Sequence, residues 1–517
     1  MREIEMKTLN TKRWLGLSAL LGSLLVVAGC SLAPTYTKPD VSAPAAFKET
    51  PQETTTALAP SEQGTWKTAQ PSEQALRGEW WTVFNDPTLN DLEHQALDAN
   101  QNLKAAAARV KESRAINQTA RAGLFPTLDA GFGPTREKFS PASQFQPANA
   151  NIPSQTLWRA EASASYEVDL FGRVSDSVKA ANADTEQSEA LFRSVQLALQ
   201  ADVAQNYFNL RELDSESEVF TRTVTLREQA LKLVQNRFNE GEISELDVAQ
   251  ARSELATAKS DAMTVQRLRA ASEHSLAVLL GKAASQFSMA ANPLTPVDIR
   301  IPPGLPSSLL ERRPDIAAAE RAMAAANSRI GVAKSAFFPS LNITGSGGFE
   351  SATLGDLFNW SSRTFLLGPF AGTALNLPIF DGGRRKGNLA NARAIYEEDV
   401  ANYRQQVLVA FQEVEDNLSD LRILQDQTRT QAEAVSASNR AAQLSRSQYT
   451  EGAVNYLDVI DAERTVLQSQ RAAVQLAGVQ ATSTVNLIRA LGGGWGDMPA
   501  APATPVAAAS NASVASR

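Results

Sequence analysis

Few side chains in this sequence could take part in a chemical reaction. The 517 residues include one cysteine, Cys30, and two histidines, His94 and His274. A disulfide framework needs more cysteines, and the common zinc sites need several cysteine or histidine ligands. The sequence also contains no nucleophile elbow and no phosphate-binding loop. We therefore expect no enzyme activity, no metal site and no cofactor other than a group bound covalently to Cys30.

Cys30 follows an N-terminal segment with the composition of an export signal. Basic residues precede an apolar run from Trp14 to Ala28, which at about 15 residues is too short to span a bilayer. The run ends in Val27-Ala28-Gly29-Cys30, which resembles a bacterial lipobox. In a lipobox the cysteine is lipidated on sulfur and becomes the new N-terminus; the alternative is an ordinary signal peptide that ends near a buried cysteine. We expect lipidation of Cys30, with diacylglycerol on sulfur and an N-acyl (palmitoyl) chain.

The residue after the cysteine is Ser31. In Gram-negative lipoproteins an Asp at this place favours retention in the inner membrane, so the resemblance implies export to the outer membrane. Each buried methylene of an acyl chain contributes roughly 0.8 kcal/mol. Several chains on one cysteine would therefore form a firm membrane anchor.

Asp458 and Asp461 are the other candidate functional residues. They follow Gly452 and are three positions apart, so that they share one face of a helix. They could be solvated acids that offset the dipole at a helix N-terminus. Any role beyond that depends on the elements that position them.

An internal repeat organises most of the chain. The first two of three duplicated motifs are 211 residues apart and the third is 213 residues apart, which indicates a duplication with small insertions. These motifs are Arg237–Gly241 with Gln448–Gly452, Leu280-Gly281 with Leu491-Gly492, and Leu124-Phe125-Pro126 with Phe337-Phe338-Pro339.

Each copy predicts the same order of elements. A helix, over about 88–123 or 311–336, ends before proline because the residue preceding proline avoids the helical region. Two strands follow, then a long helix, a turn that contains glycine, and a partner helix that ends at Leu-Gly. The long helices run without proline from Gly172 to Glu240 and from Gly383 to Thr450, and at 1.5 Å per residue each would reach roughly 100 Å.

The strands alternate apolar and polar residues, as Trp158 and Arg159 illustrate. This pattern is typical of a membrane barrel with lipid outside and water inside, and also of a half-buried sheet in a soluble domain. Four strands cannot close a membrane barrel, which needs about eight. An open sheet edge is not tolerated in lipid. Either the sheet is soluble, or several chains share one barrel. The expected strands lie near 126–136, 157–169, 339–350 and 364–379.

The partner helices carry a seven-residue apolar repeat, which is typical of coiled coils. A plain antiparallel coiled coil would show the same repeat. The expected seam is Ile460, Leu467, Val474, Ala481 and Ile488 in the second copy and, by the repeat spacing, Ala249, Ala256, Met263, Ala270 and Ala277 in the first.

Composition and the repeat together suggest the organisation of the chain. The net charge of −7 argues against a nucleic-acid binder, which would need a basic face. Both flanking segments are rich in small residues and proline and lack an apolar period. We expect a lipoprotein-type signal peptide (1–29), a lipid-anchored extended linker (30–75), repeat 1 (76–285), an inter-repeat linker (286–310), repeat 2 (311–496) and a disordered tail (497–517).

These features together resemble the TolC-like outer-membrane factors, and most closely their lipoprotein branch, the OprM-like or NodT-type channels of RND efflux systems. The resemblance implies a mostly α fold with a transmembrane β portion. Three chains would each give four strands to a twelve-stranded barrel that continues into a periplasmic α-helical barrel. The segments that carry the resemblance are Cys30 with Pro34–Pro39, Trp80–Pro87, Tyr166–Arg173, Arg312–Ile316 and the duplicated glycine turns.

The resemblance also implies a function. Such a homotrimer is a passive exit duct for small molecules such as drugs, and connects a periplasmic adaptor protein and an inner-membrane RND pump to the outside of the cell. The alternatives are the exit duct of a type I protein-secretion system and a lipid-anchored periplasmic coiled-coil scaffold without a pore. The amphipathic strands argue against the scaffold.

Roles for individual residues follow from the same resemblance. Asp458 and Asp461 match aspartates that ring the closed periplasmic entrance, and Asp247 and Tyr449 match residues that tie neighbouring hairpins together. The turns at Gly241 and Gly452 would lie at the periplasmic tip. A clasping arginine of some members would fall at Val454 here, so that link is absent or replaced.

Overall fold

The computed structural model describes residues 31–39, 43–44, 46–49, 79–295, 299, 309–367 and 375–493. The predictions for Cys30, the signal peptide and the C-terminal tail lie outside these residues, as does most of the expected lipid-anchored linker. None of the helices in the described ranges combines the length and apolar character needed to cross a membrane.

The chain divides into two units, which we describe separately. The strand unit comprises residues 1–40, 108–189 and 318–405, and the hairpin unit comprises residues 41–107, 190–317 and 406–517. The two longest helices contribute residues to both units: α4 (Arg173–Asn239) and α8 (Arg384–Thr450).

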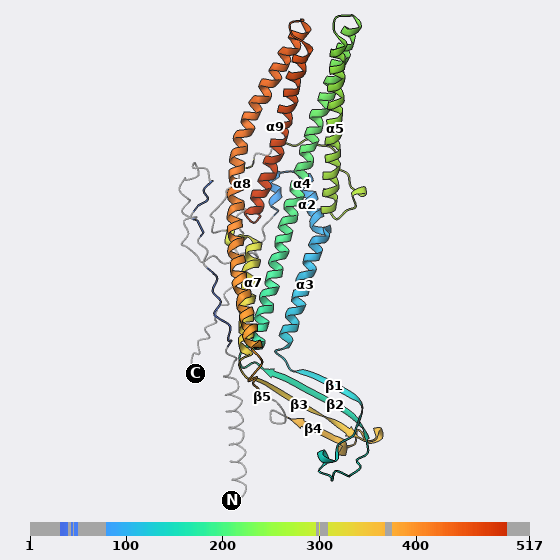
Figure 1. Cartoon of the computed structure of the whole chain (residues 1–517), viewed down its shortest axis with the longest axis vertical. Helices are drawn as coiled ribbons and strands as arrows, with labels where there is room; N and C mark the ends of the chain where they lie inside the picture. Colours follow the sequence, from blue (N-terminus) through green and yellow to red (C-terminus); the bar gives the residue numbers. More distant parts are fainter. Residues whose placement is uncertain are drawn as a thin grey trace, which may run out of the picture. The chain divides into compact units, whose positions relative to one another are not determined.

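The strand unit contains one antiparallel sheet in the order β1-β2-β3-β4, in which β2 and β3 join the two repeats (Figure 1). The predicted fourth strand corresponds to two short strands that both pair with β3, and residues 368–374 between them lie outside the described chain. The strands are β1 (Thr127–Glu137), β2 (Gln155–Val168), β3 (Ser340–Ser351), β4 (Arg363–Leu367) and β5 (Leu375–Asn376).

The two faces of the sheet differ as the alternation predicts. On one face the rings of Phe132 and Trp158 lie 6.0 Å apart. On the other, Arg159 forms ion pairs with Glu350 at 2.7 Å and with Glu137 at 3.5 Å. Large apolar side chains on the first face are exposed in the single chain: Phe132 is 64% exposed and Leu128 79%.

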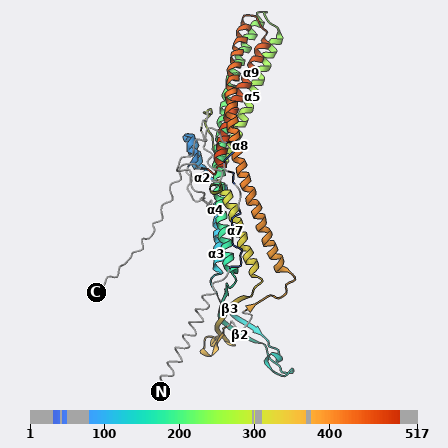
Figure 2. The same ribbon diagram turned by 90° about the vertical axis from the view of Figure 1, so that its left-hand side faces the viewer.

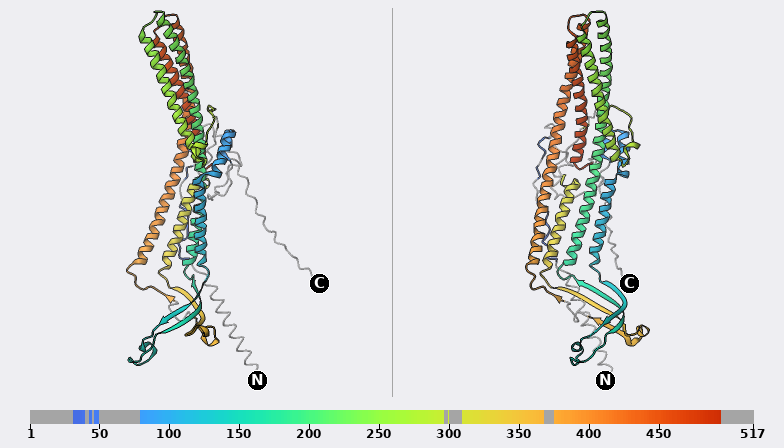
Figure 3. Two further views of the ribbon diagram at one scale, coloured as in Figure 1. Left: turned by 90° about the vertical axis from the view of Figure 1, so that its right-hand side faces the viewer. Right: turned by 45° about the vertical axis from the view of Figure 1, so that its right-hand side comes forward.

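The hairpin unit contains two antiparallel helical hairpins, α4 with α5 and α8 with α9 (Figures 1 and 3). Both α4 and α8 contain 67 residues, and their partners both contain 35, so the duplication extends to helix length. The upper parts of all four helices lie side by side in a second view as well (Figure 2). The partner helices are α5 (Glu245–Leu279) and α9 (Tyr456–Ala490).

The helix expected over 88–123 is two helices, α2 (Pro87–Ala99) and α3 (Gln101–Ala122). Asn100 between them has a ψ of 128°, outside the helical region. Its side chain accepts from Leu103 N at 3.0 Å and donates to the carbonyl of Leu279 at 2.8 Å. The single-helix prediction is wrong because asparagine caps a new helix here, as this residue type commonly does.

The corresponding helix of repeat 2 is also interrupted. α6 (Leu309–Arg312) and α7 (Pro314–Ser335) are separated by one residue, Arg313. The steric effect of proline on the preceding residue explains the break at Arg313.

The expected inter-repeat linker is in part held to the hairpin unit. Arg211 donates to the carbonyl of Ala290 at 2.9 Å, and Arg269 donates to the carbonyl of Met289 at 2.8 Å. The described residues at the start of the lipid-anchored linker also make specific contacts. The described parts of both expected linkers therefore make specific contacts with other segments.

The seam predicted for α5 has the wrong register over most of the helix, although its last member, Ala277, is buried. Met263 is 66% exposed, and Ala249 and Ala256 are exposed as well. In the alanine-rich α5 two seven-residue registers look alike in sequence, and the packing of larger side chains such as Val265 selects one. The prediction fits α9 better, where Ile460, Ala481 and Ile488 are buried. The buried seven-residue register in α5 is Ala251, Ala258, Val265 and Ser272.

The main core of the hairpin unit forms around Trp80 and Trp81. The indole of Trp80 donates to Gln200 on α4 at 3.0 Å. Leu89 of α2, Leu276 of α5 and Ile488 of α9 complete this core. The Trp-Trp segment thus attaches the N-terminal part of repeat 1 to helices from both hairpins.

Candidate functional site

The two hairpin tips have the same backbone geometry. Gly241 and Gly452 have φ angles of 80° and 78°, in the left-handed region that favours glycine. The next residues, Glu242 and Ala453, donate their N–H groups back to the carbonyls of Arg237 and Gln448 at 2.9 and 2.8 Å. A Cβ atom at either glycine would meet nothing within 4 Å. Glycine is therefore required for backbone conformation and not for space.

Asp247 and Asp458 perform the same local task after these turns. Asp247 accepts from the backbone N–H of Ser244, and Asp458 accepts from that of Asn455, both at 3.1 Å. Each forms a capping box at the start of the partner helix. The capping interpretation of Asp458 is therefore part of its role.

Asp461 lies one helical turn after Asp458, and both side chains are exposed. The matching position in repeat 1 is Gln250, so the carboxylate of Asp461 has no counterpart in the first hairpin. A cap accounts for Asp458 but not for Asp461. Of the two predicted gate acids, Asp461 has the stronger claim to a role other than folding.

Arg237 on α4 contacts Tyr449 on α8, which ties the hairpins together at their tips. Its guanidinium carbon lies 5.0 Å from the ring centre of Tyr449. It also donates to the carbonyl of Tyr449 at 3.5 Å and to Glu242 at 2.8 Å. Sequence reasoning missed Arg237, whose counterpart in repeat 2 is the uncharged Gln448. Val454, where a clasping arginine could have stood, packs against an apolar cluster.

Tyr449 is largely buried within this cluster. Its hydroxyl has no hydrogen-bond partner among the residues that the structure describes. Burial raises the pKa of Tyr449, and the nearby charge of Asp247 raises it further, whereas Arg237 lowers it. Asp247 and Tyr449, two of the four hairpin-tip residues suggested by the resemblance, thus lie near enough for the charge of one to affect the pKa of the other.

A network of five charged residues lies further along the hairpins. At its centre Arg227, whose side chain is only 3% exposed, pairs with Glu254 at 3.2 Å and with Glu463 at 3.4 Å. Glu254 also pairs with Arg464, and Glu463 pairs with Arg446 at 2.7 Å. The members come from α4, α5, α8 and α9, so the network connects all four helices of one chain.

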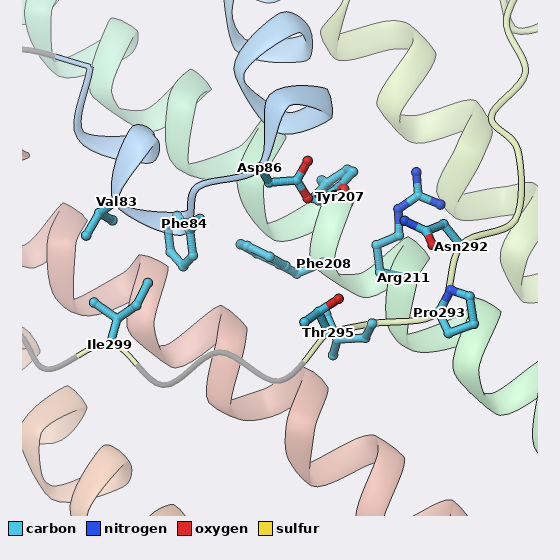
Figure 4. Close-up of a pocket in the computed structure, with 11 residues that line it drawn as sticks. Val83, Phe84, Asp86, Tyr207, Phe208, Arg211, Asn292, Pro293, Thr295 and Ile299 are labelled. Atoms are coloured by element: carbon cyan, nitrogen blue, oxygen red, sulfur yellow. Dashed lines mark hydrogen bonds between the residues drawn. The ribbon is translucent and has the colours of Figure 1, made fainter.

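A cavity of about 150 Å³ lies beside the Trp-Trp core (Figure 4). The Tyr207 hydroxyl donates to Asp86 at 2.5 Å, and Arg211 donates to Asp214 at 2.8 Å while lying over the Tyr207 ring. These polar groups bind one another, and the volume is below the roughly 300 Å³ at which ligand pockets begin. In the described ranges no three His, Cys, Asp or Glu side chains are grouped as a metal site.

Two features define the class of this protein: a sheet with an exposed apolar face, and two long duplicated helical hairpins. Residues 92–282 and 305–493 match the sequence model of the family described as outer membrane efflux protein. The chain belongs to this family, and the predicted resemblance to TolC-like outer-membrane factors is confirmed.

The chain is similar over most of its length to proteins of known role. It is 34% identical over 480 residues to the probable efflux pump outer membrane protein SepC of Pseudomonas putida, with 93% of this chain and 97% of the relative covered. It shares the same identity and coverage with the toluene efflux pump outer membrane protein TtgF of Pseudomonas putida. With the cation efflux system protein CusC of Escherichia coli it is 31% identical, over 91% of this chain and 97% of the relative.

Solved structures confirm the predicted fold class. The outer-membrane channel OprN superposes with a TM-score of 0.79 at 28% identity, covering 90% of this chain and all of OprN. The open state of the MtrE outer membrane channel of Neisseria gonorrhoeae gives 0.74 at 29% identity, covering 90% of this chain and 98% of MtrE. The protein is an outer-membrane component of an efflux system, with the fold of outer-membrane channels.

Proposed function

We propose that three copies of this chain form the passive exit channel of a tripartite efflux system. The exposed apolar face of a sheet with only four strand positions carries the proposal. Within the described residues β1 forms one sheet edge and the short strands β4 and β5 form the other, and none of the three pairs with a further strand. Exposed edges are not tolerated in lipid, and four strands are too few for a barrel. Twelve strands from three chains would satisfy both constraints.

The proposed partners are a periplasmic adaptor protein and an inner-membrane pump of the RND type. Energy would come from the pump, because the duct itself is passive. The relatives are named for efflux of toluene and of cations, which favours small molecules over secreted proteins as cargo. Lipid attached to Cys30 would anchor each chain to the outer membrane, from which the hairpins extend into the periplasm.

We place the gate at the hairpin tips. In a trimer, Asp458 and Asp461 would contribute six carboxylates to one narrow entrance. Such a ring would attract cations, repel anions and bind divalent ions. Opening would require the hairpins to move apart, so contacts such as Arg237 with Tyr449 would favour the closed state.

The test is planar-bilayer conductance of the purified protein. Wild type should give a small, cation-selective current that divalent ions block, and Asp461→Ala should give a larger, less selective current. Asp458→Ala tests the other acid, and Asp426→Ala, which removes an exposed carboxylate of α8, is the control. A larger current in Asp458→Ala but not in Asp426→Ala would assign the effect to charge at the gate. No current from a folded protein would contradict the channel.

A further inference from the structure

The first residue that the structure describes, Ser31, is bound to a buried carboxylate. Its hydroxyl donates to Asp176, lying 2.7 Å from Oδ1 and 2.9 Å from Oδ2. Asp176 is in the first turn of α4 and is fully buried, although Ser31 itself is exposed. The ammonium of Lys179 lies 2.9 Å from the same carboxylate. All of these residues belong to the strand unit.

Two glycines make room for this contact. A Cβ atom on Gly172 would lie 2.8 Å from the Cα of Ser31. A Cβ atom on Gly331 would lie 2.2 Å from the Asp176 carboxylate and 2.8 Å from the Cβ of Ala33. All three distances are shorter than non-bonded atoms tolerate. A side chain at either position would displace the chain that enters there.

The residues after Ser31 continue along α7 in the opposite direction. Asn327 donates to the carbonyl of Pro34 at 2.8 Å, and the Tyr36 hydroxyl donates to the buried Glu320 at 2.6 Å. Residues 31–39, which we call the N-terminal strap, thus lie against positions 331, 327 and 320 of α7 in turn. The strap is therefore held at several points.

We propose that Gly172, Asp176 and Gly331 form a socket for the residue that follows the lipidated cysteine. The inference rests on the proposed lipidation of Cys30. Ser31 is thereby held at the first turn of α4. That turn follows β2, which ends at Val168, so the socket holds the start of the described chain close to the end of a strand.

The socket also limits which residue can occupy position 31. A small hydroxyl residue fits against Gly172 and can donate to Asp176. An aspartate there would place a second carboxylate against the buried one, which like-charge repulsion and desolvation oppose. A serine at this position thus serves the docking of the mature chain as well as the sorting of the lipoprotein.

Hydrogen–deuterium exchange of the purified, full-length protein tests the socket. Ser31→Ala removes one hydroxyl from an exposed residue and should leave the fold intact. Loss of a hydrogen bond to a charged group should speed amide exchange in residues 31–38 by about tenfold, with exchange at the start of α9 unchanged. Asp176→Ala and Gly331→Ala should have the same local effect.

The matched control is Asp184→Ala. Asp184 is on α4, like Asp176, but its carboxylate pairs with Arg329 of α7 and not with the strap. Unchanged exchange of the strap in Ser31→Ala would overturn the proposal, as would equal exchange in all four variants. Intact mass reports lipidation separately. A strap that is protected on an unlipidated protein would keep the socket and refute the anchor, whereas a lipidated protein with an unprotected strap would do the reverse.

Discussion

The guanidinium carbon of Arg237 lies 5.0 Å from the ring centre of Tyr449, which sets a cation of α4 against an aromatic ring of α8. The contact joins the two hairpins of one chain at the place where the proposed gate has to open. A cation–π contact contributes about 0.5–2 kcal/mol, depending on its desolvation. It is therefore strong enough to shift a closed–open equilibrium and weak enough for a partner protein to break.

Replacing Arg237 should favour the open channel. We expect Arg237→Ala to raise the fraction of time spent open a few-fold in single-channel recordings, because the cross-hairpin contact is lost. Arg222→Ala is the matched control: Arg222 is also on α4, but pairs with Glu218 of its own helix and is exposed. Identical recordings from the two variants would exclude Arg237 from the closed-state contacts.

The ion network around Arg227 should stabilise the hairpins. Removing one member of a buried pair leaves an uncompensated charge, which can cost 3–5 kcal/mol. Here Glu254 and Glu463 keep Arg464 and Arg446 as partners, so we expect Arg227→Met to lower the free energy of unfolding by about 2 kcal/mol. Thermal unfolding followed by circular dichroism in detergent measures this loss.

The control for Arg227 is Arg429→Met, which breaks an exposed pair with Asp426 on α8. Exposed pairs contribute about 0–1 kcal/mol and are screened by salt, so this variant should unfold close to wild type. Equal melting temperatures for the two variants would show that the network contributes no more than a surface pair.

The caps at the two tips allow a matched comparison of the stability of three variants. Asp247→Ala and Asp458→Ala should each lower the free energy of unfolding by about 1 kcal/mol, because each leaves the backbone N–H of the N-cap residue without its side-chain acceptor. Asp461→Ala should change it by less than about 0.5 kcal/mol. Denaturant unfolding of the three variants tests the order. A larger loss for Asp461 than for Asp458 would contradict the assignment of the cap.

Local features of the fold were predictable from the sequence. The turns at Gly241 and Gly452 follow from a glycine that ends a long helix, and the duplication doubled the evidence for each. The sheet faces followed from simple alternation, since the period of a strand is two. The caps by Asp247 and Asp458 also involve residues only three positions apart.

Features that depend on packing between distant segments were not predictable. The register of α5 was wrong because alanine fits several faces of a helix. Arg237 and Arg227 were missed because their partners Tyr449 and Glu463 lie more than two hundred residues away in the chain, and a lone arginine on a helix gives no sign of its partner. Nor did composition show that Ser31 has a buried acceptor at Asp176.

Glu93 on α2 should make the stability of the protein depend on pH. Its side chain is 0% exposed, and neither carboxylate oxygen has a hydrogen-bond partner in the described part of the chain. Burial raises the pKa of Glu93 from 4.5 to about 9. At neutral pH the folded chain therefore keeps a proton that the unfolded chain releases, and the carboxyl group is neutral.

The sign follows from this difference in bound protons. The raised pKa leaves stability intact below about pH 4.5, and stability falls as pH rises toward about 9, by at most about 1.4 kcal/mol per pH unit for each chain. Replacing Glu93 by glutamine tests this dependence, because Glu93→Gln carries a neutral side chain of the same shape at every pH. The variant should match the stability of wild type near pH 4.5 and become progressively more stable than wild type at higher pH. Denaturant unfolding between pH 4.5 and 9 measures the difference, with Glu112→Gln, an exposed carboxylate of α3, as the control that should follow wild type throughout. If the free energy of unfolding had the same pH dependence in Glu93→Gln and wild type, the carboxyl group of Glu93 would not be buried and neutral in the folded chain.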